Sequence, residues 1–210
     1  MNASDQEDLN RLIEHAKTGD QQALAGLFGR YRQQLRRMIL FRLDPQLRGR
    51  VDPSDILQEA FIDSAARLPE FVKGDRLTFF VWLRLVTKER LLRVHRQHLM
   101  AQKRDARREV SQVQLTAGVT SVHLVNQLCD HYTSVLGQAI RAEQQVRLQA
   151  ILETMDELDR DIIGLRIFEG LSNSQAAEVH GLTKQTASKR FVRAIGRLRE
   201  GLAGLPGFES

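Results

Sequence analysis

A cationic segment towards the carboxyl end of the chain carries residue types suited to binding a nucleic acid. Between positions 184 and 201 the sequence has six basic residues and one acidic residue. Arginine and lysine bind phosphates, whereas glutamine and serine can hydrogen-bond to base edges. If this segment is a helix, it suits the major groove of duplex DNA. The predicted contacts to bases or phosphates are Lys184, Gln185, Thr186, Ser188, Lys189, Arg190 and Arg193.

The residues before this segment predict a helix-turn-helix that would position it. Ser172 can cap a short first helix, Gly181 supplies a left-handed turn residue, and Thr183 can cap the second, basic helix. Alanines at 176 and 177 would let the two helices pack closely. Two alternatives stay open at this point: an ordinary helical hairpin with a solvated cationic face, and a helix-turn-helix that contacts protein instead of DNA.

A second strong pattern lies between Val51 and Leu68. Asp52 and Pro53 are typical of a helix cap and a first helical residue, and apolar positions recur with helical spacing until Pro69, where we expect the helix to end. The opposite face would then display a ridge of polar side chains, Asp55, Gln58, Glu59 and Asp63. Such a ridge could pair with basic and amide groups of another protein.

The next segment turns from aromatic to basic. We expect a loop from Pro69 to Thr78 and then a long helix from Phe79 to Arg96. Rings stack on unpaired bases and cations follow the backbone, so this composition suits single-stranded DNA. Trp82, Arg84, Lys88 and Arg93 are the helix residues that we predict to contact DNA. Simple core packing is the competing explanation for the aromatic residues.

Composition narrows the function classes further. The chain has 210 residues, of which 42% are hydrophobic and 27% charged, so it can form one or two domains with true cores. A single cysteine, Cys129, excludes an internal disulfide framework, and no apolar run reaches the length of about eighteen residues that a membrane span needs. The N-terminal residues lack an apolar signal core, so we expect a cytoplasmic protein that has no membrane association.

Motifs for catalysis or metal binding are weak. His95 and His98 are three residues apart, but no nearby carboxylate or cysteine completes a convincing metal site. The sequence has no phosphate loop, dinucleotide fingerprint or nucleophile elbow. We therefore expect a protein that is not an enzyme and that has no metal and no cofactor.

Positive charge is concentrated in three zones although the net charge is only +5. Residues 30–50 contain seven basic side chains and one acid, and residues 88–109 contain eight basic side chains and three acids. The basic helix at 184–201 is the third zone. Separated basic zones on an otherwise acidic chain indicate contact with a polyanion at several places. For the first zone, a solvated helix face is the simplest interpretation.

Helical periodicity dominates the chain, and no strand-like alternation of useful length occurs. We predict an all-α protein of two small helical domains. The first covers residues 1–109 and opens with helices at 9–16, 21–28 and 31–43. A linker at 110–136, with a short helix at 122–128, leads to the second domain at 137–210.

The two motifs, in this order and spacing, resemble those of bacterial sigma factors of the sigma-70 family, of the extracytoplasmic-function (ECF) type. The resemblance covers most of the chain outside the linker. It implies that residues 52–68, with the Asp55-to-Phe61 core, dock on the clamp helices of core RNA polymerase. It also implies that residues 77–96 melt and hold the minus-ten element, while the helix-turn-helix at 171–198 reads the minus-35 element as duplex.

The resemblance adds further expectations. Family members form a pocket for an extruded base where this chain has the loop residues Phe71, Lys73 and Arg76. The implied partners are core RNA polymerase and promoter DNA, duplex and melted, with an anti-sigma factor as a further candidate. The chain departs from the family in lacking the asparagine that many members have near Lys88, and in its longer segment 97–136. The rival functions are a DNA-binding regulator independent of polymerase and a helical adaptor for acidic proteins.

Overall fold

The computed structural model describes residues 3–74, 77–105, 124–125, 128 and 138–203. Every element named within these ranges is helical, which confirms the predicted all-α class. The chain divides into two compact units, residues 1–115 and 116–210. The predicted linker at 110–136 lies outside the described residues except for 124, 125 and 128, which are helical.

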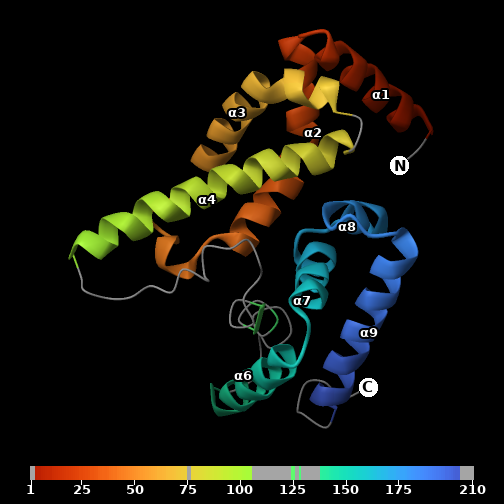
Figure 1. Cartoon of the computed structure of the whole chain (residues 1–210). Coiled ribbons are helices and arrows are strands. Elements are labelled where there is room, and N and C mark those ends of the chain that lie inside the picture. Colours follow the sequence, from red (N-terminus) through yellow and green to blue (C-terminus); the bar gives the residue numbers. More distant parts are fainter. Residues whose placement is uncertain (1–2, 75–76, 106–123, 126–127, 129–137, 204–210) are drawn as a thin grey trace. The chain divides into compact units, whose positions relative to one another are not determined.

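The described part of unit 1 contains the α-helices α1 (Ala3–Lys17), α2 (Gln21–Arg42), α3 (Pro53–Lys73) and α4 (Phe79–Asp105) and a short 3-10 helix at Pro45–Leu47. Figure 1 labels the four α-helices. The turn between α1 and α2 follows from two residues. Gly19 adopts a φ of 93°, and the Asp20 carboxylate accepts hydrogen bonds from the backbone N–H groups of Gln22 and Ala23. The predicted opening helices at 21–28 and 31–43 are one continuous helix.

α3 begins as predicted but ends later. Asp52 caps it through a 2.7 Å hydrogen bond from Ser54 N–H, and the helix then continues through Pro69 to Lys73. A proline inside a helix costs one backbone hydrogen bond. Here the extra turn carries Phe71 to ring-centroid distances of 5.3 Å from Phe79 and 5.0 Å from Trp82. Aromatic packing offsets the lost bond, so the predicted loop from Pro69 was wrong over its first half.

α4 and α2 supply most of the described core of unit 1. The aromatic start of α4 is buried, with Phe79 3% exposed and Trp82 6% exposed, and the helix continues past Arg96 to Asp105. His95, one of the two histidines considered for a metal, is buried on this helix and its Nε2 accepts a 3.3 Å hydrogen bond from Asp44 N–H. Burial lowers the pKa of His95, which favours the neutral imidazole that this bond requires.

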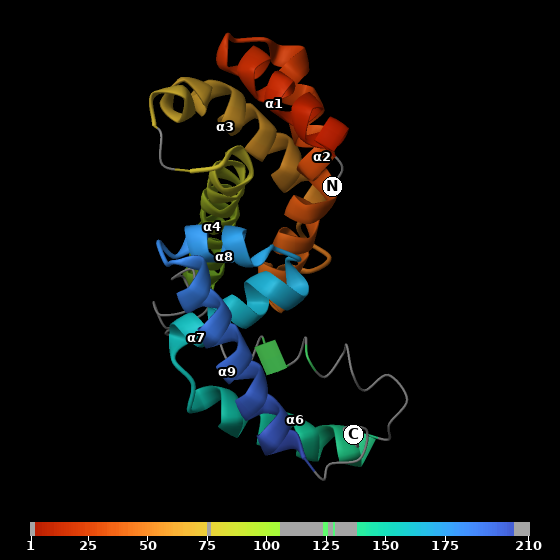
Figure 2. The ribbon, with the colours of Figure 1, turned by 90° about the vertical axis from the view of Figure 1, so that its right-hand side faces the viewer.

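Unit 2 contains α6 (Gln138–Glu153), α7 (Glu157–Ile163), a π-helical turn (Gly164–Phe168), α8 (Asn173–Val179) and α9 (Lys184–Leu202). Figure 2 shows α9 running along the other helices of the unit, and its contacts are with α6, α7 and α8. The packing on α6 is close, because a Cβ atom at Gly201 would lie 2.3 Å from Ile151 Cδ1. The long basic helix is therefore held along its whole length.

Among the described residues, no helix combines the length and the apolar character that crossing a membrane requires.

Candidate nucleic-acid and protein interfaces

The helix-turn-helix of unit 2 forms from the capping residues that the sequence predicted. Ser172 and Gln175 make a reciprocal capping box, with Gln175 N–H donating to Ser172 Oγ at 3.2 Å and Ser172 N–H donating to Gln175 Oε1 at 2.8 Å. Gly181 adopts a φ of 63°, which allows Leu182 N–H to reach the Ala177 carbonyl at 2.8 Å. These local bonds set the angle between α8 and α9.

A side chain that sequence reasoning missed ties the two helices together. Asn173 Nδ2 donates a 2.7 Å hydrogen bond to the backbone carbonyl of Lys184, at the start of α9. Thr183 caps α9 by accepting a 3.1 Å bond from Thr186 N–H. The first turn of α9 is thus fixed from two directions, which matters because this turn carries the predicted base-reading residues.

Most of the predicted minus-35 residues lie on the solvent-facing side of α9. Lys184, Gln185, Thr186, Ser188 and Lys189 are all exposed. The opposite side is buried through small residues, Ala187 and Ala194, which let α9 pack closely on its neighbours. The helix therefore presents a polar, cationic surface over its first turns and has no acid there.

Arg190 takes a different role from the predicted phosphate clamp. Its Nη1 donates to Asp159 Oδ1 at 2.6 Å and lies 3.4 Å from Asp156 Oδ2, and only 25% of its side chain is exposed. The hydrogen bond that Arg190 donates to Asp159 raises the pKa of Arg190. Arg193, three residues on, is 56% exposed and lies 3.9 Å from Asp159 Oδ2. We therefore correct the assignment: Arg190 anchors α9 to α7, whereas Arg193 is accessible.

Some side chains of the polar ridge on α3 are exposed to solvent, and others form ion pairs with α4. Asp55 and Gln58 are exposed as predicted. Glu59 is 51% exposed and lies 3.1 Å from Arg90 Nη1. Asp63 is only 16% exposed, because Arg90 donates to both of its oxygens at 2.9 and 2.7 Å and Arg93 approaches at 3.3 Å. Asp63 is thus a link between α3 and α4, which corrects its prediction as a displayed docking residue.

The Asp63 ion pair has a clear electrostatic signature. The hydrogen bond from Arg90 is the largest cause that lowers the pKa of Asp63, and the positive charges of Arg90, Arg93 and Arg67 act in the same direction. The pKa of Arg90 is raised by the same bond. Both groups stay charged at neutral pH. Bidentate pairs of this kind fix orientation as well as adding stability.

The predicted minus-ten residues of unit 1 do not form one surface. Trp82 and Arg84 are buried, at 6% and 3% exposure, so we correct them to core residues. Phe71 is half-buried against the aromatic cluster. The remaining members are Lys73 and Arg93, which are exposed, Lys88, which is half-buried, and Arg76, which lies outside the described residues.

The sequence comparison identifies the family behind these features. The sequence model of the ECF sigma factor family matches residues 6–202. This chain belongs to the ECF sigma factor family. It is a sigma factor, a protein of transcription initiation, and the family implies RNA polymerase and promoter DNA as partners. No curated protein matches the chain.

Solved structures support the fold of this sigma factor. The structure of CnrH in complex with the cytosolic domain of CnrY is 22% identical in sequence, covers 93% of this chain and 97% of that chain, and has a TM-score of 0.51. At this identity the likeness concerns the fold alone. It agrees with the all-α architecture read from the helices of both units.

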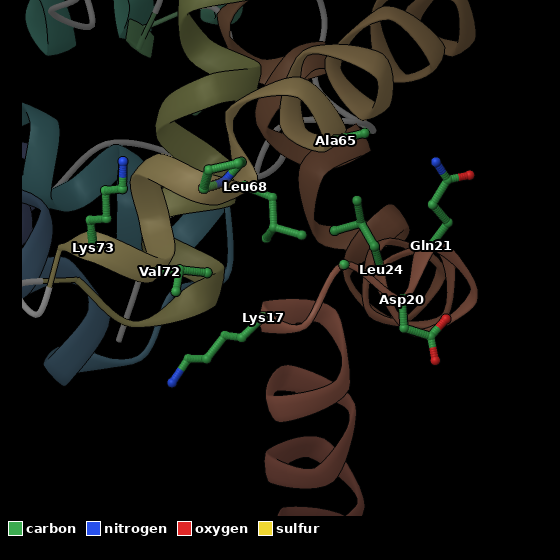
Figure 3. Close-up of a pocket in the computed structure, with 10 residues that line it drawn as sticks. Lys17, Asp20, Gln21, Leu24, Ala65, Leu68, Val72 and Lys73 are labelled. Atoms are coloured by element: carbon green, nitrogen blue, oxygen red, sulfur yellow. The ribbon is translucent and has the colours of Figure 1, made fainter.

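A hollow of about 290 Å³ lies between the α1–α2 turn and the end of α3 in this sigma factor (Figure 3). Leu24, Leu68 and Val72 form its apolar wall. Two of its charged residues already have local roles, since Asp20 caps α2 and Lys17 pairs with Glu14 at 2.9 Å. We interpret it as a packing hollow where the turn meets α3.

Metal ligation has no geometric basis in the described ranges, where no group of three or more histidine, cysteine, aspartate or glutamate side chains is placed to hold a metal ion. His95 is occupied by the Asp44 backbone instead.

Proposed function

We propose that this sigma factor binds core RNA polymerase through the exposed part of α3 and directs initiation by reading a minus-35 duplex with α9. The exposed, acid-free first half of α9 carries this proposal, because Asn173 and Arg190 fix the helix that presents its cations and amides. A preorganised polar helix surface loses little entropy when it enters a major groove.

The polymerase contact is assigned to Asp55 and Gln58, with Glu59 at its edge. Asp55 and Gln58 are exposed on α3, and Glu59 is half-exposed beside Arg90. A carboxylate and an amide on one helical face can meet basic and amide groups of a partner helix, and the charge would set the register of docking. Asp63 stabilises the position of this surface, because its hydrogen bond with Arg90 holds α3 to α4.

Melting and holding of the minus-ten element is assigned to the cations of unit 1 that remain accessible. Lys73 at the end of α3 and Arg93 on α4 are exposed, and Phe71, two residues before Lys73, packs half-buried on the aromatic cluster. Cations that follow the backbone and a ring edge near them match what a melted strand needs. The buried Trp82 would act by keeping these elements rigid.

A protein that blocks this sigma factor is a further proposed partner. CnrH, which has a similar fold, was solved with the cytosolic domain of CnrY bound. An anti-sigma factor of this chain would cover the α3 ridge or the α9 face and compete with core polymerase for it.

The test is association with core RNA polymerase, measured by size-exclusion chromatography. Wild type should co-elute with polymerase, and Asp55→Ala with Gln58→Ala should weaken co-elution and leave helical content unchanged. A matched control changes Gln6 and Asp8 to alanine, because these exposed α1 residues have the same two side-chain types. If wild type does not bind polymerase, a polymerase-independent DNA-binding regulator becomes the better description.

A second arm tests α9. Lys184→Gln with Lys189→Gln should weaken binding to duplex DNA and leave polymerase association intact, since both residues are exposed and far from α3 in sequence. Unchanged DNA binding in this variant would contradict the assignment of α9.

A further inference from the structure

The first basic zone of the sequence carries exposed arginines that the proposed function does not use. α2 contains five arginines, no lysine and no acid. Arg32, Arg36 and Arg37 are exposed on it, and Arg48 and Arg50 are exposed in the segment that follows. We call the exposed residues Arg32, Arg36, Arg37, Arg48 and Arg50 the α2 arginine face; the last two follow the helix in sequence. This face is the densest run of exposed positive charge among the described residues of unit 1.

The arginines of this face differ from the other arginines of the unit. Arg67 pairs with Glu70 and Glu89, and Arg90 pairs with Asp63. Within the described ranges, by contrast, no acidic side chain forms an ion pair with Arg32, Arg36, Arg37, Arg48 or Arg50. Unit 1 therefore pairs the arginines between α3 and α4 with carboxylates but leaves these five arginines without an ion pair among the described residues.

Uncompensated charge has a cost that solvation alone does not explain. Arg32 and Arg36 are four residues apart, a spacing at which like charges destabilise a helix by about 0.2–0.5 kcal/mol. A solvated face would tolerate glutamate at either position and gain from it. The helix is thus less stable than it would be with charges of both signs on this face. Such a loss of stability is expected when the face serves to bind an anion.

We propose that the α2 arginine face binds the phosphate backbone of duplex DNA. The proposal rests on the proposed function, which brings promoter DNA to this protein, and adds a contact separate from α9. Guanidinium groups bind phosphate oxygens in a bidentate manner. The helical rise separates Arg32 and Arg36 by about 6 Å along the axis, close to two base-pair steps of about 3.4 Å. Arg32 and Arg36 can therefore each contact a phosphate along one strand.

The composition of the face favours DNA over an acidic protein. Protein interfaces are centred on buried apolar and aromatic anchors with charges at the rim. On the exposed side of α2, Leu40 is the large apolar residue, and it is only 38% exposed. Gln33, which lies between Arg32 and Arg36, is exposed and adds an amide that can donate to a phosphate oxygen.

The test is the salt dependence of binding to a fluorescein-labelled duplex of arbitrary sequence, followed by fluorescence anisotropy with the full chain. Each lost phosphate contact should lower the log–log salt slope by about 0.9, so Arg32→Gln with Arg36→Gln should lower it by roughly two. The matched control is Arg11→Gln with Lys17→Gln. It removes the same charge from exposed α1 residues that pair with Asp8 and Glu14. This control should leave the slope unchanged.

The outcomes separate this inference from the proposed function. A lower slope in the α2 variant, with native Trp82 fluorescence, supports the α2 contact. A slope equal to wild type overturns it. Loss of polymerase association in the α2 variant, without a change in the slope, also overturns it, because the face would then bind protein. The Lys184→Gln, Lys189→Gln variant reports on α9 alone, so a change there and not in the α2 variant sustains only the proposed function.

Discussion

The two units hold the helices that we propose to contact DNA with the same arrangement of side chains, in different surroundings. In unit 1, Asp63 of α3 is gripped by Arg90 and Arg93 of α4. In unit 2, Asp159 of α7 is gripped by Arg190 and Arg193 of α9. Each clamp joins one carboxylate to two arginines that are three residues apart on the neighbouring helix. In each clamp the first arginine, Arg90 or Arg190, lies closer to the carboxylate than the second, which we call the outer arginine.

Burial separates the two clamps. The Asp63 side chain is 16% exposed and that of Asp159 is 4% exposed. The unit 1 clamp also contacts Glu59, which stands at the edge of the proposed polymerase surface. The unit 2 clamp lies under α9, behind the exposed residues. Docking on α3 can therefore act on the first clamp directly, whereas the second clamp is a fixed support.

Breaking the buried clamp should have the largest effect. Asp159→Asn leaves Arg190 without its main carboxylate, and losing one partner of a buried pair costs about 3–5 kcal/mol. Because Arg190 is one-quarter exposed and regains some water, we expect about 2–3 kcal/mol. The melting temperature of unit 2 should fall by about 10 °C, measured by far-ultraviolet circular dichroism.

Two controls make that result specific to α9. Asp156→Asn removes the exposed second carboxylate, at 72% exposure, and should change stability by less than about 0.5 kcal/mol. Trp82 is the single tryptophan and lies in the core of unit 1, so its fluorescence transition should not move. Equal destabilisation by both aspartate variants would show that Asp159 is not the main anchor.

Breaking the more open clamp should cost less and should depend on pH. Asp63→Asn removes a charged, bidentate acceptor worth about 1.5–2 kcal/mol. The pKa of Asp63 is lowered below its ordinary value of 3.8, chiefly by the Arg90 hydrogen bond. The advantage of wild type over the variant is therefore fully present above pH 3.8 and is lost as the pH falls through the lower folded value.

Urea unfolding followed by Trp82 fluorescence measures this difference. We expect the wild-type and Asp63→Asn curves to be separated at neutral pH and to converge in acid. A separation that persists unchanged below the folded pKa would mean that shape, and not charge, holds α3 to α4.

Features that depend on a few neighbouring residues could be predicted from the sequence. The caps at Asp52, Ser172 and Thr183 and the turn at Gly181 follow from side-chain and backbone chemistry within one turn, and the structure confirms all four. The exposure of Lys184, Gln185, Thr186, Ser188 and Lys189, with Ala187 buried between them, follows from the helical period once the helix is placed.

Features that depend on how helices cross could not be predicted in this way. Asp63 and Arg90 are 27 residues apart, and Asp159 and Arg190 are 31 apart, so no local spacing pairs them. The same limit explains Pro69, where a local helix breaker is overcome by aromatic packing between α3 and α4. α7 mixes charged and apolar residues and contains a second aspartate, Asp161, so no local signal marked Asp159.

The outer arginines of the two clamps give the finest comparison. Arg93 lies 3.3 Å from Asp63 and is 44% exposed, and Arg193 lies 3.9 Å from Asp159 and is 56% exposed. Partly exposed pairs contribute about 0–1 kcal/mol, so Arg93→Gln and Arg193→Gln should each destabilise by less than 1 kcal/mol, Arg93→Gln more because its ion pair is shorter. Arg193→Gln should also lower the salt slope of duplex binding by about 0.9. Thermal unfolding and anisotropy of the same preparations measure both effects. Suppose that Arg193→Gln destabilised unit 2 as much as Asp159→Asn and left the salt slope unchanged. Arg193 would then be part of the anchor and not of the DNA surface. The two clamps would be alike in function as well as in form.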